Sequence, residues 1–182
     1  MIGRFVRDKS TGVPKIAWRF WLLLLLSIGF VAAENLFDFR LSIPSMLKAS
    51  GGLPLLDMRL WYTPADAYQL FDTLGPAGRA DYRLLYLTVD IIIPLLITTL
   101  LWSGISRGAL KRFRVLGMLG GAFDYLENIT VLILLAKYPE HLSYLVIIAA
   151  GFTLLKAVSY VSGACLAIIG FLIKVFRRRA PV

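Results

Sequence analysis

The stretch VLGMLGGAFDYLENITVLILLA, residues 115–136, is apolar over the length of a membrane helix and yet contains two acids and an amide. At about 1.5 Å per residue it spans about 33 Å, which matches the hydrocarbon core of a bilayer. Asp124, Glu127 and Asn128 are spaced i, i+3 and i+4, so they share one side of the helix. Glycines 117, 120 and 121 extend the same side, where they allow a neighbouring helix to approach closely. We expect this side to face protein.

Three further apolar segments have comparable lengths and lie at about residues 16–36, 84–106 and 142–173. The chain is 58% hydrophobic, above the roughly 45–50% of soluble domains, and the excess is concentrated in these blocks. The sequence therefore predicts an all-α integral membrane protein, a four-transmembrane-helix bundle that forms one domain over residues 1–182. The last segment is longer than a bilayer needs, so we expect it to tilt, kink or protrude.

Lys and Arg are distributed unequally between the two ends of these helices. Of the twenty, thirteen lie in residues 1–19, 107–114 and 174–179, six lie near the opposite ends, and Lys156 lies within a helix. The positive-inside rule then places both termini in the cytoplasm, and we predict a bacterial inner (plasma) membrane. The net charge is +9, and we expect the basic side chains to contact anionic membrane lipids. We exclude nucleic acid as a partner.

Residues 37–83 should form a large, partly helical extracytoplasmic segment between the first two membrane helices. Residues 63–66, TPAD, predict a helix start, because threonine caps the helix, proline suits its first position and the aspartate meets its positive end. Gly75-Pro76 should interrupt that helix before it continues into the second membrane span. We expect residues 36–54 to be irregular, with an interfacial turn around Met46 as the one local structure that they could form.

Charged side chains also occur inside the predicted membrane helices. Asp90 lies in the second helix, Asp124 and Glu127 in the third and Lys156 in the fourth. A lone charge near the bilayer centre costs about 2.5–3.5 kcal/mol on insertion scales, so such groups pair or line a polar cavity. Asp124 and Lys156 should lie at similar depths, and we predict a buried ion pair between them. Tyr160, one turn beyond Lys156, extends the polar side of the fourth helix.

Several polar residues should lie in the outer half of the membrane. They are Asp90, Glu127 and Asn128, with Glu34 near the outer boundary. We expect them to share a cavity that opens outward beneath the extracytoplasmic segment. Close like charges cannot all ionise, so at least one carboxyl should keep a proton that it can exchange.

A polar and aromatic group precedes the predicted helix start, and it consists of Asp57, Arg59, Trp61 and Tyr62. It either covers the mouth of the cavity as a lid or forms an interfacial aromatic belt with a local ion pair. Both interpretations remain open at this point.

The single cysteine, Cys165, lies in an apolar run and is expected to be a small buried hydrophobe. It cannot form an intrachain disulfide, so thiol-relay chemistry is excluded. With one histidine and one cysteine a zinc site is not expected, and we expect no metal and no cofactor. The predicted topology resembles those of claudins and vitamin-K-reductase-like proteins, but their loop cysteines are missing here, so the resemblance implies a topology and no activity.

The leading hypothesis is a pocket that binds a lipophilic small molecule and transforms it by acid–base chemistry. Asp90, Glu127 and Asp124 are the candidate catalytic residues, and an enzyme of this kind would be an isomerase, cyclase or hydratase. The candidate binding residues are Asn128, Lys156, Tyr160, Glu34, Asp57, Arg59, Trp61 and Tyr62.

Other functions are compatible with the same residues. The polar groups could only hold helices together, at about 0.6 kcal/mol each. The chain could be an accessory or structural subunit of a larger membrane complex, with its polar sides against partner helices. It could also be a proton or cation carrier, which with four helices would require a homo-oligomer.

Overall fold

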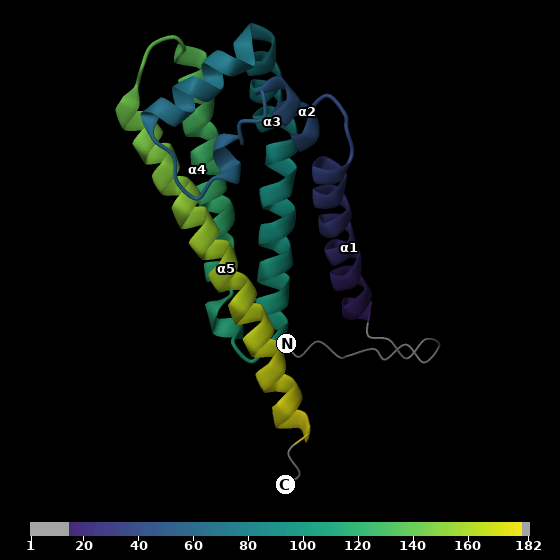
Figure 1. Ribbon diagram of the computed structural model, residues 1–182. Helices are drawn as coiled ribbons and strands as arrows, with labels where there is room; N and C mark the ends of the chain where they lie inside the picture. Colours follow the sequence, from purple (N-terminus) through teal and green to yellow (C-terminus); the bar gives the residue numbers. More distant parts are fainter. Residues whose placement is uncertain (1–14, 180–182) are drawn as a thin grey trace.

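The computed structural model describes residues 15–179, which are helical apart from turns and short connections. The elements are α1 (Lys15–Leu36), α2 (Ile43–Ala49), the 3₁₀ turn η1 (Leu56–Met58), α3 (Pro64–Arg107), the 3₁₀ turn η2 (Lys111–Phe113), α4 (Leu116–Lys137) and α5 (Ser143–Arg179). Figure 1 shows the start of α1 and the end of α5 at the same end of the molecule, which we call the terminal end. The opposite end, which carries α2 and η1, is the loop end.

Four helices, α1, α3, α4 and α5, are each long and apolar enough to cross a membrane. Their outer surfaces expose large apolar side chains such as Trp21, Leu25 and Leu95, which suits contact with acyl chains. The prediction of an all-helical membrane protein with four apolar helices is confirmed to this extent. The long last helix protrudes, since Figure 1 shows α5 continuing past the other helices at the terminal end.

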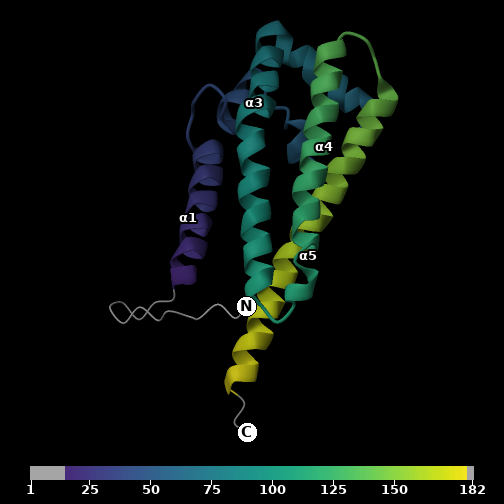
Figure 2. The same ribbon diagram turned by 180° about the vertical axis from the view of Figure 1, so that it is seen from behind.

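The helices α3, α4 and α5 pack on one another, and α1 lies beside α3. Figure 2, from behind, shows α3 between α1 and α4. Glycines allow α4 to approach both of its neighbours closely. A Cβ atom on Gly120 would lie 2.3 Å from the Tyr160 ring of α5, and one on Gly121 would lie 2.2 Å from the Thr98 hydroxyl of α3. The glycine side of this helix therefore faces protein.

The helix α3 begins and bends as its sequence predicts. The Thr63 hydroxyl accepts a hydrogen bond from the backbone N–H of Asp66, and the Asp66 carboxylate accepts one from the N–H of Thr63. Gly75 has φ 61° and ψ −177°, a conformation that glycine adopts without a Cβ penalty. The residues before this bend lie across the loop end, and those after it run through the bundle (Figure 1).

Two local expectations were wrong. Residues 36–54 were expected to be irregular with at most a turn around Met46, but they contain the helix α2 around that residue, because Ser42 caps its start and Pro44 occupies its first turn. Cys165 was expected to be buried, but its side chain is exposed on the outer surface of α5. An apolar run of membrane helix has a lipid-facing side as well as a buried one, and composition alone does not separate them.

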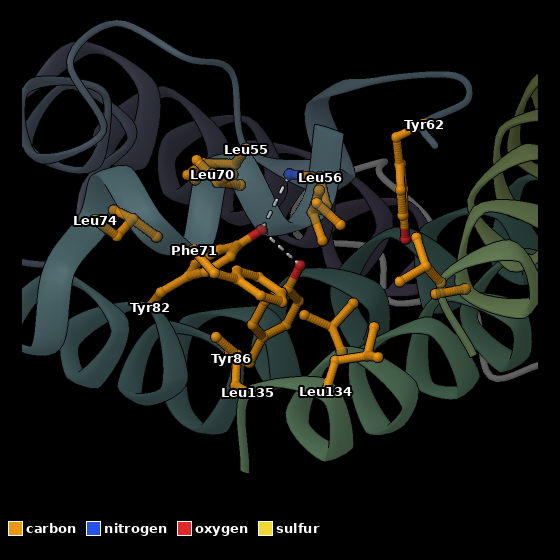
Figure 3. Packing of buried hydrophobic residues seen from close by; sticks show 14 of the residues in the cluster. Leu55, Leu56, Tyr62, Leu70, Phe71, Leu74, Tyr82, Tyr86, Leu134 and Leu135 are labelled. Atoms are coloured by element: carbon orange, nitrogen blue, oxygen red, sulfur yellow. Dashed lines mark hydrogen bonds between the residues drawn. The ribbon is translucent and has the colours of Figure 1, made fainter. Parts of the chain in front are cut away.

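The main apolar core lies at the loop end, where η1 and the first part of α3 pack on α4 and α5. Figure 3 shows Tyr82 and Tyr86 beneath η1 with their hydroxyls together. The Tyr82 hydroxyl accepts a hydrogen bond from the backbone N–H of Leu56 at 3.0 Å and lies 3.0 Å from the Tyr86 hydroxyl. Both tyrosines are fully buried, so this contact holds η1 against α3. It also determines where the next residue, Asp57, is placed.

Candidate functional site

A cavity of about 240 Å³, the acidic cavity, lies among α1, α3, α4 and α5 on the loop-end side and is bordered by α2 and η1. Its ionisable lining consists of Glu34 from α1, Asp57 from η1, Asp90 from α3, Asp124 from α4, and Lys156 and Tyr160 from α5. The apolar lining includes Val31, Ile93 and Ile97, which come from α1 and α3. The cavity lining therefore combines ionisable and apolar side chains.

An ionic network joins α4 to α5 at this cavity. The Lys156 ammonium lies 2.6 Å from Glu127 Oε2 and 3.3 Å from Asp124 Oδ1. The contact to Glu127 is an ion pair without hydrogen-bond geometry, whereas Lys156 donates a hydrogen bond to Asp124. Glu127 Oε1 accepts a hydrogen bond from Thr153 at 2.7 Å, and Asp124 Oδ2 accepts one from Tyr160 at 3.0 Å. The predicted ion pair between Asp124 and Lys156 is therefore present as part of a triad. The third member, Glu127, makes the shorter contact to Lys156.

The Asn128 side chain forms a hydrogen bond to the backbone of α3. Its side-chain amide donates a hydrogen bond at 3.0 Å to the backbone carbonyl of Asp90. In a regular helix that carbonyl would accept from residue 94, but Pro94 has no N–H to donate. A carbonyl without a partner is costly in hydrocarbon, so a side chain from α4 replaces the missing donor. This contact also fixes the height of Asp90 relative to α4.

The carboxyl of Asp90 has no such partner. It lines the acidic cavity, its Oδ2 atom is buried without a hydrogen-bond partner, and the residue is 8% exposed. A buried polar atom without a partner costs about 1–3 kcal/mol. Asp90 is therefore a strongly polar group directed at the cavity that the surrounding protein does not satisfy.

The structure separates the predicted site residues into two sets. Glu34, Asp57, Asp90, Asp124, Lys156 and Tyr160 line the cavity, whereas Glu127, Asn128, Arg59, Trp61 and Tyr62 do not. Successive residues of an α-helix diverge by about 100°, so Asp124 faces the cavity while Glu127 turns toward α5 and Asn128 toward α3. The outer cavity that we expected to hold Glu127 and Asn128 is lined instead by Asp124 and Asp57.

The polar and aromatic group before α3 is also divided. Asp57 alone enters the cavity lining, while Tyr62 is buried nearby and Trp61 is half exposed. Arg59 lies 3.4 Å from Asp66 and donates hydrogen bonds to the carbonyl of Pro54. Of this group only Asp57 lines the cavity, while Arg59 stabilises the loop itself.

Sequence reasoning missed the apolar wall and the role of Pro94. Val31, Ile93 and Ile97 resemble every other apolar residue of a membrane helix, so no local signal distinguished them. Pro94 did offer a signal, because a proline inside a helix leaves the carbonyl four residues earlier, that of Asp90, in need of a donor. The spacing of Asp90 and Pro94 therefore could have predicted a polar contact from a neighbouring helix.

The cavity concentrates negative charge. The four acids that line it and the neighbouring Glu127 give five carboxyls, and Lys156 is the one cationic side chain among the described residues of the lining. Burial raises the pKa of the Asp57 carboxyl above its ordinary value, and Lys156 only partly opposes this. Asp57 Oδ1 is also buried without a hydrogen-bond partner. The site therefore has room for additional positive charge or for hydrogen-bond donors.

Replacing Asp57 by asparagine should alter how stability depends on pH. A carboxyl whose pKa is higher in the folded state stabilises the fold at low pH and loses that contribution as pH rises through the folded value. The thermal midpoint in detergent should fall from about pH 4 upward, and Asp57→Asn should reduce this fall and be the more stable form at neutral pH. Asp38→Asn, at an exposed ion pair with Lys48, is the matched control and should leave the pH profile unchanged. An Asp57→Asn profile parallel to wild type would contradict the prediction.

Within residues 15–179, no three of the histidines, cysteines and acids are placed to hold a metal ion. Comparison with known proteins adds no functional assignment to this geometry. No protein-family model, curated protein sequence or solved structure matches the chain.

Proposed function

We propose that this protein binds a membrane-soluble amphiphile in the acidic cavity and exchanges protons with it. The polar head of the ligand would carry a positive charge or several hydrogen-bond donors, and its apolar part would remain in the membrane. The unpartnered, buried carboxyl oxygen of Asp90 in the cavity wall is the observation that supports this most directly. Lipids of a bacterial inner membrane would surround the protein, with both termini in the cytoplasm and the loop end outside.

Charge favours a cationic or donor-rich head. With five carboxyls around one ammonium, full ionisation would leave several negative charges close together at low dielectric. Protons or a cationic ligand relieve that repulsion, whereas an anionic ligand increases it. A molecule with an amine or hydroxyl head would also supply the hydrogen bond that Asp90 lacks.

The size of the cavity limits how much of the ligand is enclosed. Pockets for whole drug-sized molecules measure about 300–1,000 Å³, so about 240 Å³ accommodates a head group and a short part of its chain. Most of the apolar lining comes from α1 and α3, through Val31, Ile93, Pro94 and Ile97, while Ile43 and Met58 add to it from α2 and η1. We therefore expect the tail to pass between these two helices into lipid.

Within this proposal Asp90 is the proton donor and acceptor. Glu127 was an equal candidate by sequence, but its carboxylate is engaged by Lys156 and Thr153 and does not line the cavity. Asp124, held by Lys156 and Tyr160, would keep its charge and orient a cationic head. A proton moved by Asp90 next to a fixed negative charge suits isomerisation, cyclisation or hydration, which pass through cationic species.

Three probes with the same twelve-carbon chain separate the contributions of charge and tail. The purified protein is titrated with dodecylamine, dodecanol and dodecanoic acid in detergent, and binding is measured by native mass spectrometry. We expect the amine to bind most tightly and the acid most weakly. Equal binding of all three would show that only the tail is recognised, which contradicts an acidic cavity.

Two variants locate the binding. Asp90→Asn keeps the backbone carbonyl that Asn128 needs, removes the carboxyl, and should weaken the preference for the amine by about tenfold, the effect of one lost charge-assisted hydrogen bond. Glu140→Gln removes an exposed acid at the same end of the molecule and should leave the preference unchanged. The cavity assignment fails if both variants retain the preference of wild type.

A further inference from the structure

A second hollow of about 460 Å³, the basic hollow, lies at the terminal end, far along the bundle from the acidic cavity. It forms where the chain leaves α3 and turns against the last turns of α5. Its lining contains four cationic side chains, those of Arg107, Lys111, Lys174 and Arg177. None of the described residues that line it is acidic.

Close backbone contact builds the wall of this hollow. A Cβ atom on Gly108 would lie 2.8 Å from the backbone of Gly170, so only glycine allows the turn to sit so near α5. The N–H of Ala109 donates a hydrogen bond to the carbonyl of Gly170 at 2.8 Å, and Lys174 donates one to the carbonyl of Arg107 at 2.6 Å. The cations of the turn and of α5 are therefore held around a shared space.

The positive charge exceeds what the helix ends require. The C-terminal ends of α3 and α5 each contribute roughly half a negative charge, about one charge in total. Four cationic side chains against this leave a net charge of about +3 at the hollow. Helix capping thus accounts for only part of the cluster, and the remainder favours an anion.

Two neighbouring arginines lie outside the hollow. Arg112 lies over the Phe113 ring at 4.6 Å, and Arg114 lies over the Trp102 ring at 4.8 Å, much as Arg107 lies over the Phe20 ring. Neither lines the hollow, although both belong to the same turn and carry the same charge. This contrast distinguishes the hollow from a generally basic surface and supplies a matched control.

We infer that the basic hollow binds a phosphate group. A phosphoryl group presents several oxygens to several donors at once, which suits guanidinium and ammonium groups converging from two helices. The Ser106 hydroxyl, buried without a partner at the lining, is a further donor. Arg107 also lies 4.8 Å from the Phe20 ring of α1, beside the lipid-exposed Trp21, so the phosphate of an anionic lipid is within reach.

Lipid titration of the purified protein in detergent tests this inference. Binding of dioleoylphosphatidylglycerol, dioleoylphosphatidylcholine and inorganic phosphate is measured by native mass spectrometry. We expect the anionic lipid to bind more tightly than the zwitterionic one. Inorganic phosphate that displaces the anionic lipid would support the site and identify soluble phosphate as its ligand, whereas equal binding of the two lipids would overturn the inference.

A pair of double variants with equal charge removes the remaining ambiguity. Lys111→Gln/Arg177→Gln takes two exposed cations from the hollow and should lower affinity for the anionic lipid roughly thirtyfold, at about fivefold per cation. Arg112→Gln/Arg114→Gln removes two cations that lie outside the hollow and should lower affinity less than about threefold, because exposed charges that do not contact the bound group are partly screened by salt. Equal losses in the two variants would mean that surface charge alone attracts lipid, and the site would be rejected.

Discussion

Replacing Lys156 by methionine is expected to destabilise the folded protein by about 3–5 kcal/mol, because it leaves two buried carboxylates without their cation. The Glu127 side chain is 0% exposed and that of Asp124 is 11% exposed, so neither can regain its full hydration where it lies. Methionine fills most of the lysine volume, so the loss reports charge rather than a cavity. The fraction of protein that stays monodisperse after heating in detergent should therefore be lower for Lys156→Met than for wild type. Lys48→Met, which breaks an exposed ion pair with Asp38, should have little effect.

The second replacement that best rescues Lys156→Met should be Glu127→Gln. Glu127 has the shorter contact to the ammonium and no exposure, whereas Asp124 keeps its hydrogen bond from Tyr160 and lines a cavity. The sequence predicted Asp124 as the partner of Lys156, because the two residues should lie at similar depths in the membrane. On that prediction, Asp124→Asn would be the rescuing replacement. Equal rescue by Asp124→Asn would show that the two carboxylates share the charge evenly, contrary to the distances.

Replacing Gly120 by alanine is expected to separate α4 from α5. The new Cβ atom would lie 2.3 and 2.4 Å from two carbons of the Tyr160 ring, which has no flexible end to move aside. Overpacking of this kind costs about 1–3 kcal/mol, more than the gain of up to about 1 kcal/mol from replacing a helical glycine. If the ring moves away instead, its hydrogen bond to Asp124 is lost. The thermal midpoint in detergent should fall in either case.

Two comparisons make this prediction specific. Gly151→Ala in α5 meets nothing within 4 Å, so it should leave the midpoint unchanged or raise it. In a Tyr160→Ala background the space beside Gly120 is empty, and Gly120→Ala should then cost little. A loss of the same size with and without the tyrosine ring would show that the contact is not the cause.

The two ends of the interior are built from different chemistry. At the loop end, large apolar side chains such as Phe71 and Leu134 are buried, as in a soluble domain. Farther toward the terminal end, glycines and hydrogen-bonded polar groups form many of the helix contacts, and most large apolar side chains turn outward, although Ile105 is fully buried. Lipid is as apolar as leucine, so within the bilayer close packing and polar contacts hold helices together.

The sequence by itself determined the local structure and the inventory of polar groups. Lengths of apolar runs located four helices, the residues TPAD marked the start of α3, and Gly75-Pro76 marked its bend. These signals succeed because capping, backbone strain and hydrocarbon contact act within a few residues. Because Asp90, Asp124 and Lys156 lie inside these apolar runs, the sequence also indicated that each needs a polar partner or a polar cavity.

Only the tertiary structure decided which partner each of these residues contacts. A sequence gives the position of a residue along its helix axis, but the rotation of that helix toward its neighbours depends on packing. A rotation of about 60° suffices to exchange Asp124 for Glu127 as the residue facing a given partner, because helical residues three apart differ by that angle. Likewise Asp57 enters the cavity only because Tyr82, distant in sequence, holds the backbone of Leu56.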